Sequence, residues 1–211
     1  MAGPAELPER IPLFPLPNAV LFPGMPLPLH IFEPRYRKMV NDAKQGHRTV
    51  GMVLLRAGWE SDYAGRPAIY PIGCAGRMDQ FEALPDGRFN IVLRGLVRFR
   101  VGQEHAGEPY RLASVVPMPE TVGDVAALEA ARPKLLAAIG RASDGPAVLV
   151  MQNELPAPHF VNALCQSLDL EPVERQSLLD CDSVEERCRR LVEILEWKAV
   201  EQTHGSGGGI H

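Results

Sequence analysis

The sequence lacks the features of exported and membrane-spanning proteins. No basic segment precedes the first apolar residues, and prolines at positions 12, 15 and 17 would break a signal helix. No apolar run reaches the roughly 18 residues that are needed to span a bilayer. The formal net charge of -4 gives no overall attraction to nucleic acid or anionic lipid. We therefore expect a cytoplasmic protein that does not enter membranes.

Motifs for catalysis are also missing. No lysine follows a glycine, which excludes a GxxxxGK[ST] phosphate loop, and the six histidines form neither HExxH nor a zinc spacing with cysteine. No GxSxG elbow is present, and no serine and lysine stand out as nucleophile and base. Glu33 and Arg35 fit a helix cap beside a solvated arginine better than an acid/base pair. We expect no enzymatic activity, no cofactor and no metal.

Cysteine is scarce. The four thiols stand at positions 74, 165, 181 and 188 and form no CxxC pair. Scattered cysteines in a chain of this size are typical of a reducing compartment, where they fill space in the core.

Strand patterns dominate the first 120 residues. Val20, Leu21 and Phe22 run into a Pro23-Gly24 turn, and a proline-rich segment with Leu27, Leu29 and Ile31 follows. Its prolines cannot donate to a ladder, which restricts this strand to a sheet edge or to an irregular pairing. Residues 49–55 are nearly all apolar and predict a central strand, while 34–44 predict a helix that begins at a proline.

The clearest pattern lies at 89–101, where every odd position is apolar or glycine. This alternation predicts a long, half-buried strand. Turn residues at 85–87 join it to a second strand at 72–84 as an antiparallel hairpin, and Gly95 in its middle indicates a bulge or bend. These patterns predict a small, bent antiparallel barrel with one helix.

Helical periods follow residue 120, with a proline at 133 that we expect to kink or divide the first segment. The predicted fold class is α+β: a β pseudo-barrel with one inserted helix, followed by a subdomain of about four helices. We expect the barrel over 8–120, the helical subdomain over 121–203 and a disordered tail over 204–211.

A family resemblance adds to these patterns. The segment IPLFPLPNAVLFPGMPLPLHIFEPRYRKMVNDA resembles the opening of the N-terminal domain of Lon proteases, and FNIVLRGLVRFRV and DLEPVERQSLLDCDSVEERCRRLVEIL resemble its later parts. The resemblance covers about Ile11 to Glu196. It implies a PUA-like pseudo-barrel that recognises unfolded polypeptides, with a protease or chaperone as a further partner. The ATPase and protease modules are absent from this sequence, so protease activity is not implied.

The proline-rich segment is the predicted peptide-binding site. An exposed sheet edge and an apolar groove are the features that hold extended chains. Met25 lies beside the turn and is expected to be exposed. The candidate residues are Phe22, Met25, Phe32 and Tyr36.

A nucleic-acid site is the alternative, since PUA-like folds include RNA readers. Alternation places four arginines on the even face of the long strand, where they could contact phosphates. The negative net charge and the absence of interleaved aromatic residues on this face argue against this alternative. Its candidate residues are Arg88, Arg94, Arg98 and Arg100.

Overall fold

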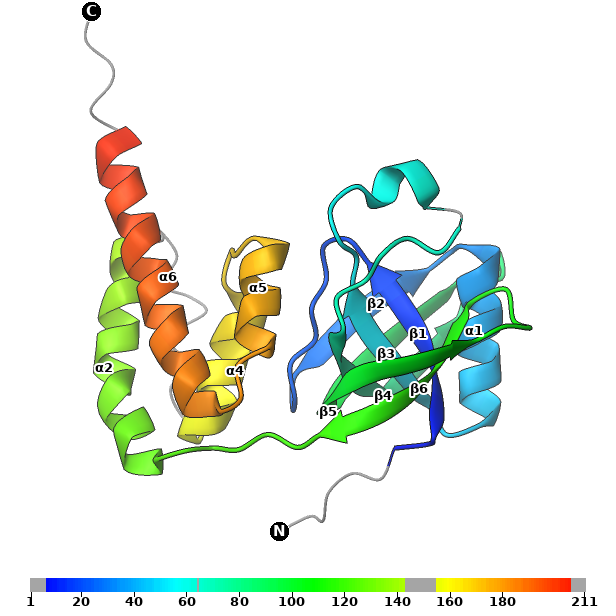
Figure 1. The fold of residues 1–211 in the computed structure, drawn as a ribbon, viewed down its shortest axis with the longest axis horizontal. Helices are drawn as coiled ribbons and strands as arrows, with labels where there is room; N and C mark the ends of the chain where they lie inside the picture. Colours follow the sequence, from blue (N-terminus) through cyan, green and yellow to red (C-terminus); the bar gives the residue numbers. More distant parts are fainter. Residues whose placement is uncertain (1–6, 64, 143–154, 206–211) are drawn as a thin grey trace, which may run out of the picture. The chain divides into compact units, whose positions relative to one another are not determined.

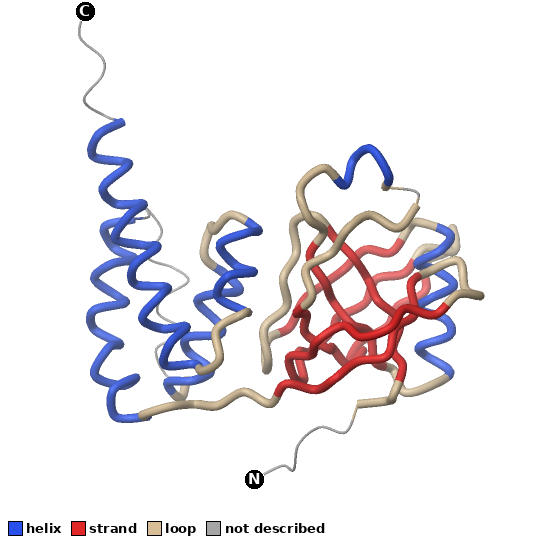
Figure 2. The backbone as a smooth tube through the Cα atoms, viewed as in Figure 1, coloured by secondary structure: helices blue, strands red, loops and turns tan. Residues whose placement is uncertain are grey.

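A computed structural model describes residues 7–63, 65–142 and 155–205. The chain divides into two compact units, which are described separately below. The strand unit comprises the chain up to Pro119 together with Glu171–Leu179, and the helical unit comprises Glu120–Leu170 together with the chain from Asp180 onward. Figure 1 shows the elements in sequence colours, and Figure 2 shows the strands in red and the helices in blue.

The strand unit is a mixed sheet that closes on itself. Its strands are ordered β2-β5-β4-β3-β1-β6, and β5 also pairs with β6, which closes the barrel. The prediction of a wholly antiparallel barrel is wrong in one place, because β1 and β3 are parallel. Between them the chain passes through β2 and α1, a crossover long enough to return it to the same end of the sheet. The elements of this unit are β1 (Arg10–Leu16), β2 (Pro26–Ile31), α1 (Pro34–Gln45), β3 (Thr49–Leu54), η1 (Trp59–Asp62), β4 (Ile72–Ala83), β5 (Phe89–His105), β6 (Arg111–Met118) and α5 (Pro172–Leu179).

The predicted hairpin and its irregularity are both confirmed. β4 and β5 pair antiparallel, and their register shifts where Ala75 pairs with Val97 but Gly76 pairs with Gly95. One extra residue on β5 therefore forms a bulge beside Gly95. In the turn between the two strands, Gly87 has a positive φ of 81°, which glycine adopts at little cost.

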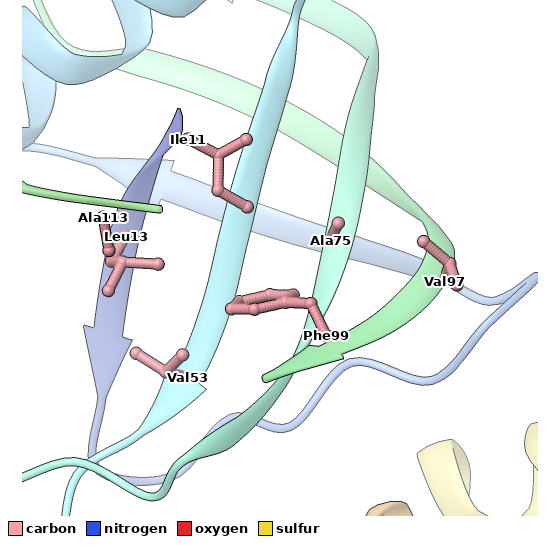
Figure 3. Packing of buried hydrophobic residues seen from close by; sticks show 7 residues of the cluster. All are labelled: Ile11, Leu13, Val53, Ala75, Val97, Phe99 and Ala113. Atoms are coloured by element: carbon pink, nitrogen blue, oxygen red, sulfur yellow. The ribbon is translucent and has the colours of Figure 1, made fainter. Parts of the chain in front are cut away.

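Apolar side chains from five strands fill the barrel, as Figure 3 shows. The Phe99 ring from β5 lies among aliphatic side chains that point inward from the neighbouring strands. This cluster explains the predicted alternation, because the odd positions of β5 supply two of its members. It comprises Ile11, Leu13, Val53, Ala75, Val97, Phe99 and Ala113, all buried.

Helix α1 begins as predicted, with Glu33 as its N-cap and Pro34 at its first position. Its buried face consists of Tyr36, Met39, Val40 and Ala43, which are the residues expected from helical spacing. The Tyr36 ring lies 4.4 Å from the ring of Phe14 on β1, measured between centroids. This contact fixes the start of α1 against the barrel.

Helix α5 belongs to the strand unit, although sequence periodicity grouped it with the helices of 121–203. Gln176 Nε2 donates a 3.0 Å hydrogen bond to the carbonyl oxygen of Ile72. Arg98 Nη1 donates a 3.0 Å hydrogen bond to the carbonyl oxygen of Leu179. The helix thus covers part of the outer face of β4 and β5.

The helical unit contains α2 (Val125–Ala142), α4 (Ala157–Ser167) and α6 (Val184–Gly205). Helix α2 is a single helix that passes through Pro133 without being divided there. The expected tail begins inside α6, which continues to Gly205, and residues 206–211 lie outside the described part. Across the described ranges, no helix is both long and apolar enough to span a membrane.

A buried ion pair ties the start of the helical unit to its helices. Arg187 on α6 is fully buried, and its Nη1 lies 2.5 Å from Oε1 of Glu120. The same Nη1 donates to Oδ1 of Asn162 on α4. Asn162 Nδ2 donates a 3.1 Å hydrogen bond to Oε2 of Glu120, which closes a three-residue network. The network connects the segment that leaves β6 with α4 and α6.

The four cysteines are free and buried, as expected for packing roles. Burial raises the pKa of the Cys165 thiol to about 12 and that of Cys188 to about 11. These two thiols therefore stay protonated well above neutral pH, and a protonated thiol is a poor nucleophile.

We expect the native protein to react with Ellman's reagent at pH 8 at least ~100-fold more slowly than the protein unfolded in guanidinium chloride. The reaction is followed by absorbance at a fixed reagent concentration. Rapid labelling of any one cysteine in the native protein would contradict the burial of the four thiols.

Candidate polypeptide-binding surface

Strand β2 is an edge of the sheet. It pairs antiparallel with β5, with Leu29 opposite Ile91, and no other described strand pairs with it. Of the two predicted placements, an edge or an irregular pairing, the structure shows the edge. The other edge of β2 is open to a further chain.

The backbone groups of the β2 prolines point away from β5. The Met25 carbonyl accepts a 2.9 Å hydrogen bond from the Gly95 amide, so Met25 presents its backbone groups to β5. Backbone groups of an antiparallel strand alternate between its two sides, so Pro26 and Pro28 present theirs to the open edge. That edge therefore offers carbonyl acceptors at both prolines and a donor only at His30.

The exposed side chains of β2 lie on one face. Pro26, Pro28 and His30 are exposed, and they alternate with Leu27 and Leu29, which are half-buried. Immediately after β2, Phe32 is 61% exposed, and its ring stacks on His30 with centroids 6.2 Å apart. An exposed phenylalanine beside two exposed prolines gives this face an apolar character. We call Pro26, Pro28, His30 and Phe32 the β2 face.

A groove of about 520 Å³ adjoins the β2 face, and it is lined by residues 28–30, 80–82 and 90–92 of three adjacent strands. A polar ladder crosses it. His30 Nδ1 and Asn90 Oδ1 are joined by a 2.8 Å hydrogen bond, and Asn90 Nδ2 donates a 2.8 Å hydrogen bond to Oε2 of Glu82. Beside this ladder, Pro28 and half-buried Val92 supply apolar surface. The groove can hold both main-chain polar groups and apolar side chains.

The structure separates the four predicted binding residues. Phe22 and Tyr36 are buried in the core, and only Phe32 lies on the surface. The expectation that Met25 is exposed is wrong, because Met25 is 8% exposed. Its amide donates a 3.1 Å hydrogen bond to the Phe22 carbonyl, so the turn folds over Gly95 and carries the side chain inward.

The four arginines of the alternative nucleic-acid site do not form a continuous exposed stripe. Arg98 is 2% exposed, because α5 covers this part of β5 and accepts its hydrogen bond. Arg88 forms an ion pair of 2.5 Å with Asp86, and Arg94 forms one of 2.6 Å with Asp79. Arg100 is exposed. Two of the four guanidinium groups are thus engaged by carboxylates and a third is buried.

Sequence patterns did not reveal His30, Asn90, Glu82 and Val92 as groove residues. Each is separated from its cross-strand neighbours by a hairpin or by a longer stretch of chain, and only the strand register brings them together. The alternation of polar and apolar residues on each strand was the available signal, since it places these positions on the outer face.

Comparison with known proteins matches this chain to Lon proteases. The family model described as "ATP-dependent protease La (LON) substrate-binding domain" matches residues 10–196. A Lon protease of Flavobacterium johnsoniae is 28% identical over 204 residues, which are 93% of this chain and 24% of that protein. A Lon protease of Roseiflexus castenholzii is also 28% identical, over 92% of this chain and 25% of that protein. The chain therefore spans about a quarter of these relatives.

Two solved structures share the fold. The crystal structure of a Lon N-terminal domain protein from Xanthomonas campestris superposes with a TM-score of 0.61 at 26% identity, covering 89% of this chain and 98% of that one. The N-terminal domain of a Mycobacterium avium complex Lon protease superposes with a TM-score of 0.70 at 18% identity, with the same coverage.

Proposed function

Since the chain belongs to the family of Lon substrate-binding domains, we propose that it is a non-catalytic module that binds unfolded or partly folded polypeptides. It would act as an adaptor or scaffold in protein quality control and pass bound chains to a protease or chaperone. The observation that carries this proposal is the β2 face, which combines an open edge, an exposed aromatic ring and an adjoining groove.

The open edge suits an extended chain. The Pro26 and Pro28 carbonyls can accept hydrogen bonds from the amides of an incoming polypeptide, and His30 can both donate and accept. These bonds use main-chain groups, so they do not depend on the sequence of the bound chain. A folded protein offers few free amides in extended geometry, which directs the edge toward unfolded chains.

The same prolines limit how tightly a chain is held. An added strand cannot receive hydrogen bonds from the two prolines, so the ladder is incomplete. This also protects the protein from pairing edge to edge with copies of itself. Apolar contacts with Phe32 and Val92 must then supply part of the affinity. We expect a dissociation constant of about 1 μM, which corresponds to about 8 kcal/mol.

Replacing Phe32 with aspartate is expected to weaken the binding of an unfolded chain about 10-fold or more, because it removes the exposed ring and places a charge on the apolar face. The melting temperature should stay close to that of the wild type, since the ring is mostly in solvent. Fluorescence anisotropy of labelled, reduced and carboxymethylated α-lactalbumin measures the affinity.

Val116→Asp provides the matched control, because Val116 is 60% exposed on β6 of the same unit and does not line the groove. It should bind the labelled chain like the wild type. Equal weakening by both substitutions, or full-strength binding by a folded Phe32→Asp protein, would refute the assignment to the β2 face.

A further inference from the structure

A second cavity in the strand unit shares no lining residue with the groove beside β2. It has a volume of about 210 Å³, and its walls come from the end of β1, the start of α1, the segment after η1 and the segment that enters β6. At about 30 Å³ per water molecule, this space holds roughly seven waters or a small organic group. The residues used below are Arg35, Tyr36, Tyr63, Arg66, Glu108 and Arg111, all of which line it.

The guanidinium group of Arg35 is held rigidly at the wall. It lies over the rings of Tyr36 and Tyr63, 4.6 and 4.9 Å from their centroids. Its Nε donates a 3.1 Å hydrogen bond to Glu33 Oε2, and its Nη1 donates a 3.2 Å bond to the Tyr63 carbonyl. The Tyr63 hydroxyl donates to the other oxygen of Glu33.

Together with a side-chain interaction with the Tyr63 hydroxyl, the described contacts use at most three of the five N–H groups of Arg35, and the remaining donors can reach the cavity. The Arg35 side chain is part-buried, so these donors are only partly accessible to solvent. A planar guanidinium with free donors and a fixed orientation is prepared to bind a planar carboxylate.

The charges around the cavity favour an anion. Arg66 and Arg111 share one carboxylate, since Glu104 lies 3.5 Å from Arg66 Nη1 and 2.5 Å from Arg111 Nη2. Three guanidinium groups, those of Arg35, Arg66 and Arg111, thus line the cavity together with one carboxylate. The one lining carboxylate, Glu108, is engaged by Lys38 at 3.2 Å.

Tyr36 adds a hydrogen-bond donor to the cavity wall. It is only 4% exposed, and its hydroxyl makes no hydrogen bond with any residue that the structure describes. Burial raises the pKa of this hydroxyl to about 12, so it keeps its proton at neutral pH. The hydroxyl belongs to a residue that lines the cavity, so it can donate a hydrogen bond to an acceptor bound there.

We propose that this cavity binds a carboxylate group, with Arg35 and Arg111 providing the positive charge and Tyr36 donating a hydrogen bond. The tyrosine rings and prolines of the wall suit the organic remainder of such a ligand better than a hydrated inorganic ion. The carboxylate can come from two sources, the C-terminus of a polypeptide or a small organic acid. The proposal does not depend on the β2 face.

Calorimetric titration of the full chain distinguishes these sources. The probes are the peptide acetyl-Ala-Ala-Leu with a free C-terminus, the same peptide as a C-terminal amide, benzoate, and inorganic phosphate. We expect the free-acid peptide or benzoate to bind, or both, and the stronger of the two identifies the source. The amide and phosphate should bind at least about 10-fold more weakly.

Two variants test the residues. Tyr36→Phe keeps the buried ring, and Arg35→Lys keeps the charge but loses the planar fork, and each should weaken acid binding about 10-fold. Arg77→Lys, at an exposed ion pair outside the cavity, should bind like the wild type, as should Phe32→Asp. Binding of the amide or phosphate as tight as that of the acids would overturn the proposal. So would no acid binding at about 10 mM, or unchanged binding by folded Arg35→Lys and Tyr36→Phe proteins.

Discussion

Replacing Glu120 with alanine is expected to lower the free energy of unfolding by about 3–5 kcal/mol. Glu120 lies 2.5 Å from the guanidinium of Arg187, which is fully buried on α6. Without this carboxylate, the Arg187 charge would stay fully buried beside Asn162, which is a neutral acceptor. An uncompensated buried charge is far more costly than the loss of an ordinary hydrogen bond.

Urea denaturation followed by circular dichroism at 222 nm measures the effect. Glu196→Ala is the matched control, because Glu196 and Lys134 form an exposed pair 3.6 Å apart on α6 and α2, and exposed pairs contribute about 0–1 kcal/mol. The double variant Glu120→Leu with Arg187→Met removes both charges and should recover most of the stability. A Glu120→Ala protein as stable as the Glu196→Ala protein would show that the Arg187 charge is compensated by other groups.

Regular periodicity predicted most elements of this fold. The strand at β5, the helix α1 and the edge position of β2 each follow from a pattern of apolar residues or prolines within one short segment. The parallel pairing of β1 with β3 has no such local signal. It depends on the crossover through β2 and α1, which brings the chain back to the end of the sheet where β1 began. Such a crossover is a property of the whole unit.

Exposure of single residues was predicted less well. Met25 stands beside a Pro-Gly turn, and turns are usually exposed, but this turn folds over the glycine of another strand. Arg98 follows the polar alternation of β5, but α5 covers it from a segment about 80 residues later. In both cases the side chain is buried by a segment that is distant in the sequence. The local pattern of polar and apolar residues therefore cannot predict that burial.

The two candidate sites also differ in how far the sequence could predict them. Part of the β2 face was predictable, because Phe32 stands next to an edge strand that its prolines identify. The carboxylate cavity was not, because Arg35, Tyr63 and Arg111 come from three separate segments. At the sequence level Arg35 resembled a solvated arginine beside a helix cap. Its stacking between two tyrosine rings appears only when the segment after η1 is in place.

Gly95 carries the strongest prediction that combines sequence and structure. A Cβ atom at this position would lie 2.1 Å from the carbonyl oxygen of Phe22 and 3.1 Å from Cα of Pro23. Both are backbone atoms, so no side-chain rotation relieves the contact. The close approach is required by two 2.9 Å hydrogen bonds, in which the Gly24 amide donates to Gly95 and the Gly95 amide donates to Met25.

Even alanine at position 95 is therefore expected to separate the turn from β5, at a cost of about 3 kcal/mol and a fall of about 10 °C in melting temperature. Valine should cost more, because its added methyl groups meet the same backbone. Gly140→Ala is the control, since among the described residues no atom outside its own helix backbone lies within 4 Å of its added Cβ, and alanine favours the helix α2 by about 0.5–1 kcal/mol. Differential scanning calorimetry of the three variants decides the matter. The result to watch for is a Gly95→Ala protein with the melting temperature of the wild type while Gly140→Ala behaves as expected. In that case the turn does not pack against β5, and Met25 is not buried beneath it.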